Sequence, residues 1–419
     1  MSRTVIVVVD GLGVGAMPDA GALRPGDLSA DTLGHVLDHC RATNGRAPQL
    51  PALAALGLGL LRPHPALAAP SALPAAVARA SLGYPGADTY AGHQTMMGAD
   101  FSRVTVARLG ERLAEVTGAL ERAGHTVEPL DGRPLLVVDR HALVHDNLEA
   151  DPGINWNVSG RLRDLPFERI LGIARTVRAV APVARVIAVG GHAEEPLPAS
   201  VRQGDCGTVG LDTPATGFYR NGGLRVRHLG APLDHSRQLP ELAARAGIPV
   251  TLVGKAADIL PCERALRRPA VPTGEVLAHT LAAVRAAGRA ARSDGTALVV
   301  ANVQETDLAG HQQDPLRFGA VLEHVDRGLG ALLAELDAPG DRLIVTGDHG
   351  NDPGIGHACH TREYVLVLVH RPGAPPLPGS GAGPARLPDA SSLADVGATA
   401  AHSLGLDPGG LAGGSPLPV

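Results

Sequence analysis

Acidic and imidazole side chains follow three apolar segments of this 419-residue chain at the points where those segments end. Asp348 and His349 come directly after the run at residues 342–346, and His360 follows a short loop later. Carboxylates and imidazoles together form a mixed oxygen and nitrogen ligand set, which suits Mn²⁺ or Zn²⁺ and, less readily, Mg²⁺. The sequence therefore predicts a metal centre. We expect His357, in the same loop, to lie outside the ligand set.

Two further segments carry the remaining candidate ligands. Asp10 closes the run at residues 4–9, and Asp307 and His311 follow the run at residues 297–303. If the three runs are neighbouring strands of one sheet, their ends meet at one edge and the ligands converge. Three carboxylates against two divalent ions leave a net charge of about +1, which attracts a phosphate monoester, and two ions about 4 Å apart can clamp a transferring phosphoryl group.

A candidate attacking group lies in the glycine-rich segment at residues 83–98. There Thr89 stands between Asp88 and His93. A threonine hydroxyl is inert at pH 7 unless a base or a metal lowers its pKa, and coordination to one of two ions would do so. From the residues alone, Thr89 is equally consistent with an ordinary loop residue.

The elements that must position these groups follow from hydrophobic periodicity. β-Branched runs predict buried strands at residues 4–9, 135–138, 185–189, 249–253, 297–303, 342–346 and 364–369. Apolar stripes predict helices at about residues 104–123, 273–292 and 315–336, the last with Asp314 as its cap and Pro315 at its first position. Strands separated by helices indicate an α/β sandwich with a mostly parallel sheet.

Composition excludes several classes of protein. The net charge of −5 argues against a nucleic-acid surface, which needs clustered positive charge. The sequence contains no apolar run of about 18 residues, which is the length that would predict a membrane span. The four cysteines are scattered without a Cys-x-x-Cys pair, as is typical of reduced thiols in the cytoplasm; they are Cys40, Cys206, Cys262 and Cys359. The sequence thus predicts a cytoplasmic protein with neither a nucleic-acid nor a membrane partner.

Several segments together resemble the phosphopentomutase family of the alkaline phosphatase superfamily, and most of all a branch of bacterial mutases without an established substrate. The segments span nearly the whole chain in the expected order, at residues 10–20, 31–35, 86–93, 253–259, 304–311, 348–353 and 360–363. The resemblance implies an α/β fold: an alkaline-phosphatase-like core with a mostly parallel central sheet, at residues 1–101 and 233–419, and a smaller inserted α/β cap domain at residues 102–232.

The same resemblance implies a ligand set and a nucleophile. One divalent metal would be held by Asp307, His311 and His360. The other would be held by Asp10, Asp348, His349 and Thr89, and Thr89 would be phosphorylated. Mn²⁺ is the expected ion, with Zn²⁺ or Mg²⁺ as alternatives, and a sugar bisphosphate is a candidate primer.

Lys255 is the only lysine in the chain and matches the family's lysine in the turn at residues 254–259. A compact ammonium can approach a phosphate or a sugar hydroxyl where the planar guanidinium of arginine would not fit. We therefore expect Lys255 to act beside Thr89 in catalysis.

The chain also departs from the family pattern. The spacing between Asp307 and His311 is one residue shorter and is similar to that of cofactor-independent phosphoglycerate mutase. Ala87 and Ala91 replace a lysine and a threonine of the nucleophile loop.

In the cap, the family's substrate-contacting pair falls near Asp139 and Arg140, and an arginine expected directly after residues 185–188 appears as Val189. We expect Asp139, Arg140 and Arg220 to bind substrate, with Arg225 and Arg227 as further candidates for phosphate. These departures leave the identity of the sugar open.

The interpretation that follows is a metal-dependent intramolecular phosphotransferase acting on a phosphosugar. It would interconvert a sugar 1-phosphate and a 5-phosphate in nucleotide and pentose phosphate metabolism. One alternative is a phosphomonoester hydrolase with the same site, and another is a mutase for a non-pentose phosphosugar. A third is a catalytically inactive binding protein that keeps the fold. The sequence leaves the oligomeric state open.

Overall fold

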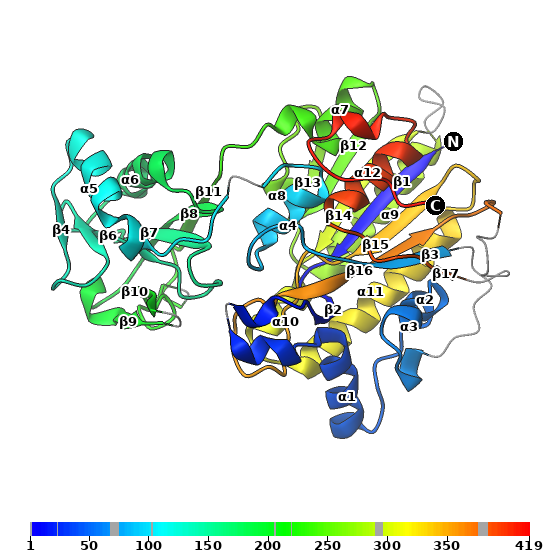
Figure 1. Cartoon of the computed structure of the whole chain (residues 1–419), viewed down its shortest axis with the longest axis horizontal. Coiled ribbons are helices and arrows are strands. Elements are labelled where there is room, and N and C mark those ends of the chain that lie inside the picture. The colour runs from blue at the N-terminus through cyan, green and yellow to red at the C-terminus, as the bar shows by residue number, and fades with distance from the viewer. Residues whose placement is uncertain are drawn as a thin grey trace. The chain divides into compact units, whose positions relative to one another are not determined.

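The computed structural model divides the chain into two compact units (Figure 1). It describes residues 2–22, 24–67, 75–101, 104–204, 207–218, 220–289, 296–375 and 384–419. Unit 1 comprises Met1–Phe101 and Leu233–Val419, and unit 2 comprises Ser102–Pro232. Residue 102 itself lies outside the described residues. Among the described helices, none is long and apolar enough to cross a membrane.

Unit 1 is built on a mixed sheet. Its strands lie in the order β13 (Leu266–Arg268), β12 (Val250–Gly254), β14 (Ala297–Val303), β1 (Arg3–Val9), β15 (Arg342–Thr346), β16 (Glu363–His370), β3 (Ala75–Ala80) and β17 (Ala385–Arg386), with β2 (Gly13–Ala16) paired to β16. The strands from β13 to β15 run parallel, and β16 runs antiparallel to both β15 and β3. The mostly parallel sheet expected from the sequence is thus present.

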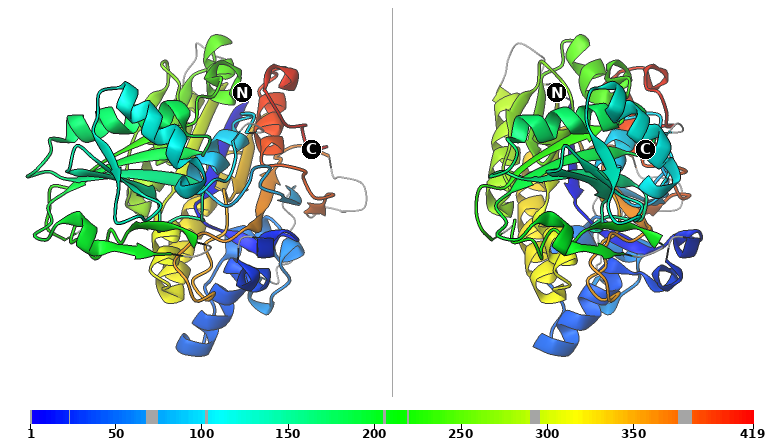
Figure 2. Two further views of the ribbon diagram at one scale, coloured as in Figure 1. Left: turned by 60° about the vertical axis from the view of Figure 1, so that its left-hand side comes forward. Right: turned by 90° about the vertical axis from the view of Figure 1, so that its left-hand side faces the viewer.

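Side-chain alternation along β1 assigns the two faces of this sheet. Val5, Val7 and Val9 belong to a core cluster with residues of the helices α1 (Thr32–Asn44), α2 (Pro51–Ala55), α9 (Thr273–Arg289) and α11 (Pro315–Glu335). Helix α12 (Ala394–Ser403) also packs against β1 but contributes nothing to that cluster, so it covers the other face. Helices α1 and α11 lie side by side (Figures 1 and 2).

Helix α11 begins and ends close to the predicted bounds. Asp314 caps it by accepting a hydrogen bond from the backbone N–H of Arg317, and Pro315 occupies the first turn. The predicted helix from Thr273 corresponds to α9 up to Arg289, and its last residues, 290–292, lie outside the described part of the chain. The three described cysteines, Cys40, Cys262 and Cys359, are free thiols, and Cys206 lies outside the described residues.

Shorter elements complete unit 1. They are the helices α3 (Leu58–Leu61), α4 (Thr89–Met96), α7 (Leu239–Arg245), α8 (Ala256–Ile259) and α10 (Glu305–His311), and the 3-10 turns Ala20–Ala22, Pro25–Ser29, Pro65–Leu67, His235–Arg237 and Pro408–Gly410.

Unit 2 has its own sheet and core. The strand order is β11 (Arg225–Gly230), β8 (Arg185–Gly191), β7 (Asn155–Arg161), β6 (Ala142–Asp146), β5 (Leu136–Val138) and β4 (Val127–Pro129), with β9 (Val201–Gln203) and β10 (Val209–Leu211) as a separate pair. Only β7 and β8 pair in parallel within the larger sheet. Helices α5 (Leu113–Arg122) and α6 (Phe167–Val180), with the 3-10 turn Leu197–Ser200, complete the unit. The fully buried Trp156 lies in its core.

One predicted helix is wrong over its first half. The pattern predicts a helix over residues 104–123, but the α-helix begins only at Leu113, after a 3-10 turn at Leu109–Arg112. The preceding backbone is held by tertiary partners instead: Ala107 N–H donates to Gly153 O at 2.9 Å, and Leu109 N–H donates to the Asp146 carboxylate at 2.7 Å. These hydrogen bonds outweigh the local helical preference.

Candidate metal centre

The expected convergence of strand ends is confirmed in unit 1. Strand β1 lies between β14 and β15 and runs parallel to both, so all three end at the same edge of the sheet. Asp10 and Asp348 follow β1 and β15, and α10 follows β14 with Asp307 and His311 one turn apart. Because β16 runs antiparallel to β15, its first residues lie at this same edge, with His360 just before them.

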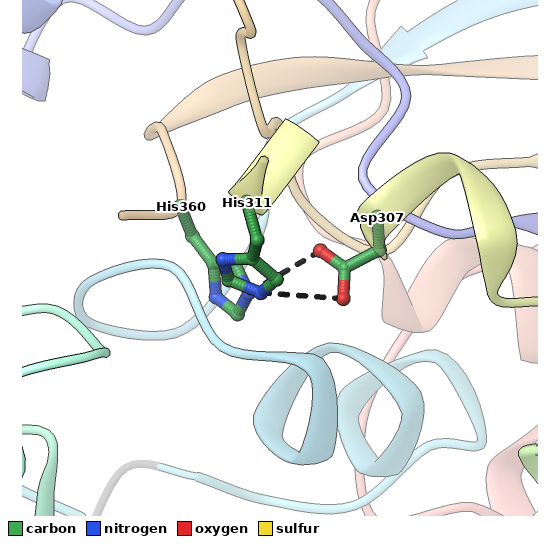
Figure 3. A group of neighbouring side chains, drawn as sticks. All are labelled: Asp307, His311 and His360. Atoms are coloured by element: carbon green, nitrogen blue, oxygen red, sulfur yellow. Dashed lines mark hydrogen bonds and ion pairs between the residues drawn. The ribbon is translucent and has the colours of Figure 1, made fainter. Parts of the chain in front are cut away.

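Asp307, His311 and His360 form one compact group of potential ligands (Figure 3). Their ligand atoms all lie within 4.8 Å of one another. The Asp307 Oδ2 atom is 3.4 Å from His311 Nε2, and Asp307 Oδ1 is 3.4 Å from His360 Nε2. This is the set that the resemblance implies for one metal.

A second group contains Asp10, Asp307 and His349. Its ligand atoms also lie within 4.8 Å of one another, so Asp307 belongs to both groups. Asp348 adjoins this group, because its Oδ2 atom is 3.4 Å from His349 Nε2. The second metal's expected ligands Asp10, Asp348 and His349 are thus neighbours, with Asp307 as an additional member.

The hydrogen bonds of the three imidazoles orient them as ligands. His311 Nδ1 lies 2.7 Å from Ala358 O, His349 Nδ1 lies 3.0 Å from Gly350 O, and His360 Nδ1 lies 3.1 Å from Ala87 O. A carbonyl oxygen only accepts, so each Nδ1 carries a proton and donates it. In the neutral rings, the lone pairs are therefore on the Nε2 atoms that face the carboxylates, as metal ligation requires.

Buried carboxylates supply a second test of fit for a divalent cation. Asp348 Oδ2 is buried, and its imidazole neighbours, His93 Nδ1 at 3.2 Å and His349 Nε2 at 3.4 Å, form no well-aligned hydrogen bond to it, although buried polar atoms are usually satisfied. Burial and the neighbouring Asp348 raise the pKa of Asp10 to about 6, which reflects crowding of negative charge. A divalent ion would offset this charge and give the Asp348 oxygen a partner, so the residues present fit a metal.

The pKa values of two further candidate ligands, Asp307 and His360, are lowered for different reasons. Burial raises the pKa of Asp307, but the neighbouring His311 and Lys255 lower it by more than burial raises it. The pKa of this carboxyl therefore lies well below the usual range. Burial and the nearby His349 lower the pKa of His360 to about 4. The His360 ring is therefore neutral near pH 7, which is the form that binds a metal.

Thr89 lies at the first turn of α4. The Asp88 carboxylate caps this helix by accepting from Ala91 N–H. The Thr89 hydroxyl oxygen is 2.8 Å from His349 Nε2 and 3.4 Å from Asp10 Oδ1. A helix N-terminus favours negative charge and commonly holds phosphate, so a phosphoryl group on Thr89 would lie in a suitable field.

Lys255 extends into the same group of residues from the turn before α8. Its ammonium lies 2.7 Å from Asp10 Oδ2, 3.3 Å from Thr89 Oγ1 and 3.7 Å from Asp307 Oδ2. Burial lowers the pKa of Lys255, but Asp10 and Asp307 raise it by more than burial lowers it. The ammonium therefore stays charged. The turn needs Gly254, which has a φ of +65° and approaches Asn302 O so closely that a Cβ would lie 2.3 Å from it.

Three polar residues that the sequence analysis left without a role hold these ligands. Asn302 Nδ2 donates to Asp10 Oδ2 at 3.0 Å, and Asn351 Nδ2 donates to Asp307 Oδ1 at 2.8 Å. His93 Nδ1 lies 3.2 Å from Asp348 Oδ2. Asn302 is a polar side chain in an otherwise apolar strand, which is the one signal by which the sequence could have indicated it.

Comparison with known proteins identifies the family. The phosphopentomutase of Methylobacterium sp. (strain 4-46) is 32% identical over 447 residues, covering 97% of this chain and 98% of the relative. The phosphopentomutase of Anaeromyxobacter dehalogenans (strain 2CP-1) is 30% identical and covers 96% of each. This chain belongs to the phosphopentomutase family. Residues 268–408 also match the model of the Metalloenzyme superfamily, and this range contains the candidate ligands Asp307, His311, Asp348, His349 and His360.

Solved structures also align over the whole chain. Protein PH0037 from Pyrococcus horikoshii is 14% identical with a TM-score of 0.45, over 96% of this chain and 97% of that one. The Leishmania mexicana phosphoglycerate mutase is 15% identical with a TM-score of 0.45, over 96% and 95% of the two chains.

The predicted substrate residues of this phosphopentomutase homologue lie in unit 2. Asp139 and Arg140 are the central residues of a β-turn in the three-residue connection between β5 and β6, with φ values of +51° and +65°. The Asp139 carboxylate lies 2.8 Å from His125 Nδ1 and accepts from Thr126 N–H at 3.1 Å. Arg140 and Arg220 are exposed.

The expected cap arginine is replaced by Val189, which is buried in β8. This strand continues two residues beyond the prediction, to Gly191. A Cβ on Gly191 would lie 2.5 Å from the ring of the fully buried Phe218, and a Cβ on Gly190 would lie 2.7 Å from Leu162. Aromatic and aliphatic packing therefore replaces a charged side chain at this point of unit 2.

Proposed function

We propose that the chain interconverts a sugar 1-phosphate and a sugar 5-phosphate through a phosphothreonine at Thr89. Its family already makes it a metal-dependent phosphosugar mutase. The observation that supports Thr89 as the phosphoryl carrier is the position of its hydroxyl. It lies at a helix N-terminus, 3.3 Å from Lys255 Nζ and 2.8 Å from His349 Nε2.

We propose two divalent ions as cofactors, with Mn²⁺ first among the candidates. Asp307, His311 and His360 would hold one, and Asp10, Asp348 and His349 would hold the other. When bound, the ions supply charge neutralisation for a phosphoryl group in transfer. Around them the chain supplies fixed groups that need no reorganisation during the reaction: the α4 N–H groups and the Lys255 ammonium.

The proposed cycle transfers one phosphoryl group in each direction. A free hydroxyl of the sugar phosphate attacks the phosphorus of phospho-Thr89. The bond from phosphorus to Thr89 Oγ1 breaks, and the hydroxyl proton passes to Oγ1, which leaves a sugar bisphosphate. After the bisphosphate turns around, Thr89 Oγ1 attacks its other phosphoryl group, and the sugar oxygen leaves and takes up a proton. A sugar bisphosphate would also prime an unphosphorylated chain.

A non-pentose sugar phosphate is the second candidate substrate. The observation that favours it is the end of β8, where the buried Val189 stands at the position of the arginine that the family pattern predicts, and the next two residues, Gly190 and Gly191, pack closely against Leu162 and Phe218. Charge-assisted hydrogen bonds from arginine are a strong means of holding a phosphate. Their loss would have to be offset elsewhere in the cap, and Arg140 and Arg220 are the proposed replacements.

Phosphorus NMR on the Mn²⁺-loaded protein tests the proposal. The substrate is ribose 1-phosphate with a trace of a ribose bisphosphate, and T89A is the control. Conversion to ribose 5-phosphate by the unaltered chain, and none by T89A, is the expected result. Release of inorganic phosphate would instead assign a hydrolase. If neither product forms with ribose 1-phosphate, hexose 1-phosphates in the same assay test the non-pentose alternative.

The cellular compartment and the binding partner of the enzyme are also part of the proposal. We propose a cytoplasmic enzyme, because the three described cysteines are free thiols. We propose a small phosphosugar as its partner, rather than nucleic acid or a membrane, given the net charge of −5.

A further inference from the structure

Glu363 is a buried carboxylate next to the metal centre that the proposed reaction does not use. It is the first residue of β16 and has no exposed surface. Its Oε1 atom accepts from the hydroxyls of Thr32 and Thr361, at 2.6 Å each. Its Oε2 atom accepts from the backbone N–H groups of Thr32 at 2.9 Å and Gly15 at 3.1 Å. One carboxylate thus joins three segments that are distant in the sequence.

These contacts continue to a metal ligand. The Thr32 hydroxyl that donates to Glu363 also accepts from Asn351 N–H at 3.2 Å. The Asn351 side chain then donates to Asp307 Oδ1 at 2.8 Å. Glu363 is therefore two residues removed from Asp307 through a chain of hydrogen bonds.

A second branch joins the two segments that carry His349 and His360. The following residues, Gly350 and Thr361, form an isolated antiparallel bridge, with N–H to O distances of 3.0 and 2.8 Å. Beside this bridge, the imidazoles of His349 and His360 stack with centroids 3.8 Å apart. The hydrogen bond from the Thr361 hydroxyl to Glu363 connects this bridge to the start of β16.

The fit around this carboxylate is tight. A Cβ on Gly350 would lie 2.3 Å from Glu363 Oε1, and a Cβ on Gly13 would lie 2.3 Å from Glu363 Oε2. Burying a carboxylate without a cationic partner costs free energy unless several donors compensate for it. The four donors, two hydroxyls and two backbone N–H groups, are all neutral, so the site keeps a costly group where an apolar side chain of similar size would avoid that cost.

We propose that Glu363 is a positioning residue for the metal centre, which sets the spacing of the His349 and His360 segments through Thr32 and Thr361. The inference rests on the metal sites of the proposed function but not on the substrate. It also assigns a role to the segment at residues 31–35, which the resemblance singled out. In that segment Thr32 contacts Glu363, and His35 Nδ1 lies 2.6 Å from the buried Asp352.

The test compares Mn²⁺ affinity with folding stability in the full chain. E363Q keeps the shape of the side chain and one accepting oxygen, but its amide nitrogen donates and so faces two of the surrounding donors without accepting from them. We expect E363Q to bind Mn²⁺ about 10- to 100-fold more weakly, which is the usual effect of losing an outer partner of a ligand. T32V should weaken binding as well, and T32S, which keeps the hydroxyl, should restore it. Titration followed by electron paramagnetic resonance measures free and bound Mn²⁺ directly.

D326N is the matched control. Asp326 is equally buried in unit 1 and accepts from Ala52 N–H at 3.1 Å and Leu53 N–H at 2.8 Å, but it joins α11 to α2 and contacts no ligand segment. Urea unfolding without metal measures the stability of each variant. We expect D326N to lose stability and to keep its Mn²⁺ affinity.

Unchanged affinity in E363Q would overturn the inference, and so would equal losses of affinity in E363Q and D326N at equal losses of stability. An unaltered chain that binds no Mn²⁺ would overturn it as well. If the chain binds Mn²⁺ as expected but converts no sugar phosphate, the proposed function fails, while the role of Glu363 stands on the binding data.

Discussion

The Nε2 atoms of His311 and His360 lie 3.2 Å apart in the metal centre. Each ring uses its Nδ1 proton for a backbone carbonyl, at Ala358 and Ala87 respectively. Two nitrogen lone pairs directed at each other over this distance repel unless a proton or a cation lies between them. Without a metal, a proton on His311 lies between them, because Asp307 raises the pKa of this ring to about 9 although burial lowers it, and a divalent cation would take the place of that proton.

This relationship predicts that metal binding stabilises the fold. A ligand that binds only the folded state raises its stability by about 2.7 kcal/mol at a concentration 100 times its dissociation constant. We expect Mn²⁺ to raise the thermal unfolding temperature and a chelator to reverse the rise. In H311N, most of the Mn²⁺-dependent increase should be lost.

H357A is the control for that experiment. His357 lies in the same loop as His360, but its Nε2 atom lies 2.8 Å from Asp27 Oδ1, outside both ligand groups. H357A should lower stability somewhat and keep the full Mn²⁺-dependent increase. An equal loss of that increase in H357A and H311N would contradict the ligand assignment.

Substitutions of Thr89 test the carrier of the phosphoryl group. T89A removes the oxygen that forms the phosphoester, so we expect no mutase turnover and no phosphorylated protein by mass spectrometry. T89S keeps the oxygen and loses only a methyl group, so both signals should persist at a reduced level. T95A, in the same buried helix, is the control and should retain phosphorylation. Phosphate found on a different residue of the active chain would contradict the prediction.

Lys255 should not be replaceable by arginine. Its ammonium is enclosed by Asp10, Thr89 and Asp307, and only 14% of its side chain is exposed. The larger planar guanidinium cannot approach all three groups at once. We expect K255R and K255M to lower kcat by similar factors of about 10² or more, as is common when a group that stabilises transition-state charge is removed. A K255R enzyme with near-normal kcat would show that charge alone is required.

The sequence predicted the strands and most candidate ligands because each ligand lies within a few residues of the strand that positions it. β14, β1 and β15 are buried runs rich in β-branched residues, and each is followed within a few residues by an acidic or imidazole group. A parallel sheet brings such ends together whatever the intervening sequence does. The pattern therefore indicated both the fold class and the edge at which the site lies.

Long-range contacts could not be predicted in the same way. Thr32 and Glu363 are 331 residues apart, and neither stands in a pattern that indicates the other. The failed helix prediction before Leu113 has the same cause, because Asp146 and Gly153 hold that backbone from other parts of unit 2. The three-residue connection at residues 139–141 lacks the glycine that normally indicates a short hairpin loop.

That turn leads to a prediction for Arg140. A non-glycine residue in the left-handed region costs about 1 kcal/mol or more, and strain of this kind is often retained where a side chain has a function. R140G should therefore raise the free energy of unfolding of unit 2 by about 1 kcal/mol. If Arg140 binds the substrate phosphate as proposed, R140G should also raise KM, whereas the exposed R122A on α5 should not. Greater stability with unchanged KM would assign Arg140 to the turn alone.

His145 gives unit 2 a pH-dependent stability. The ring is fully buried in β6, with Nε2 2.9 Å from the Ser159 hydroxyl, and burial lowers its pKa to about 4. Between an unfolded pKa of about 6.5 and this value, the unfolded chain binds a proton that the folded chain does not. Stability is therefore full above about pH 6.5 and decreases as the pH falls toward 4, by about 3 kcal/mol in total.

Trp156, the only tryptophan of the chain, lies in the core of unit 2 and reports its unfolding by fluorescence. Urea titrations between pH 4 and 7 should show a smaller decrease in the free energy of unfolding for H145Q than for the unaltered chain, because glutamine does not titrate. H141Q, at an exposed position five residues after Leu136, should follow the unaltered chain. Parallel pH profiles for all three proteins would mean that His145 takes up its proton equally in the folded and unfolded states, and the low-pH loss would then have to come from other groups.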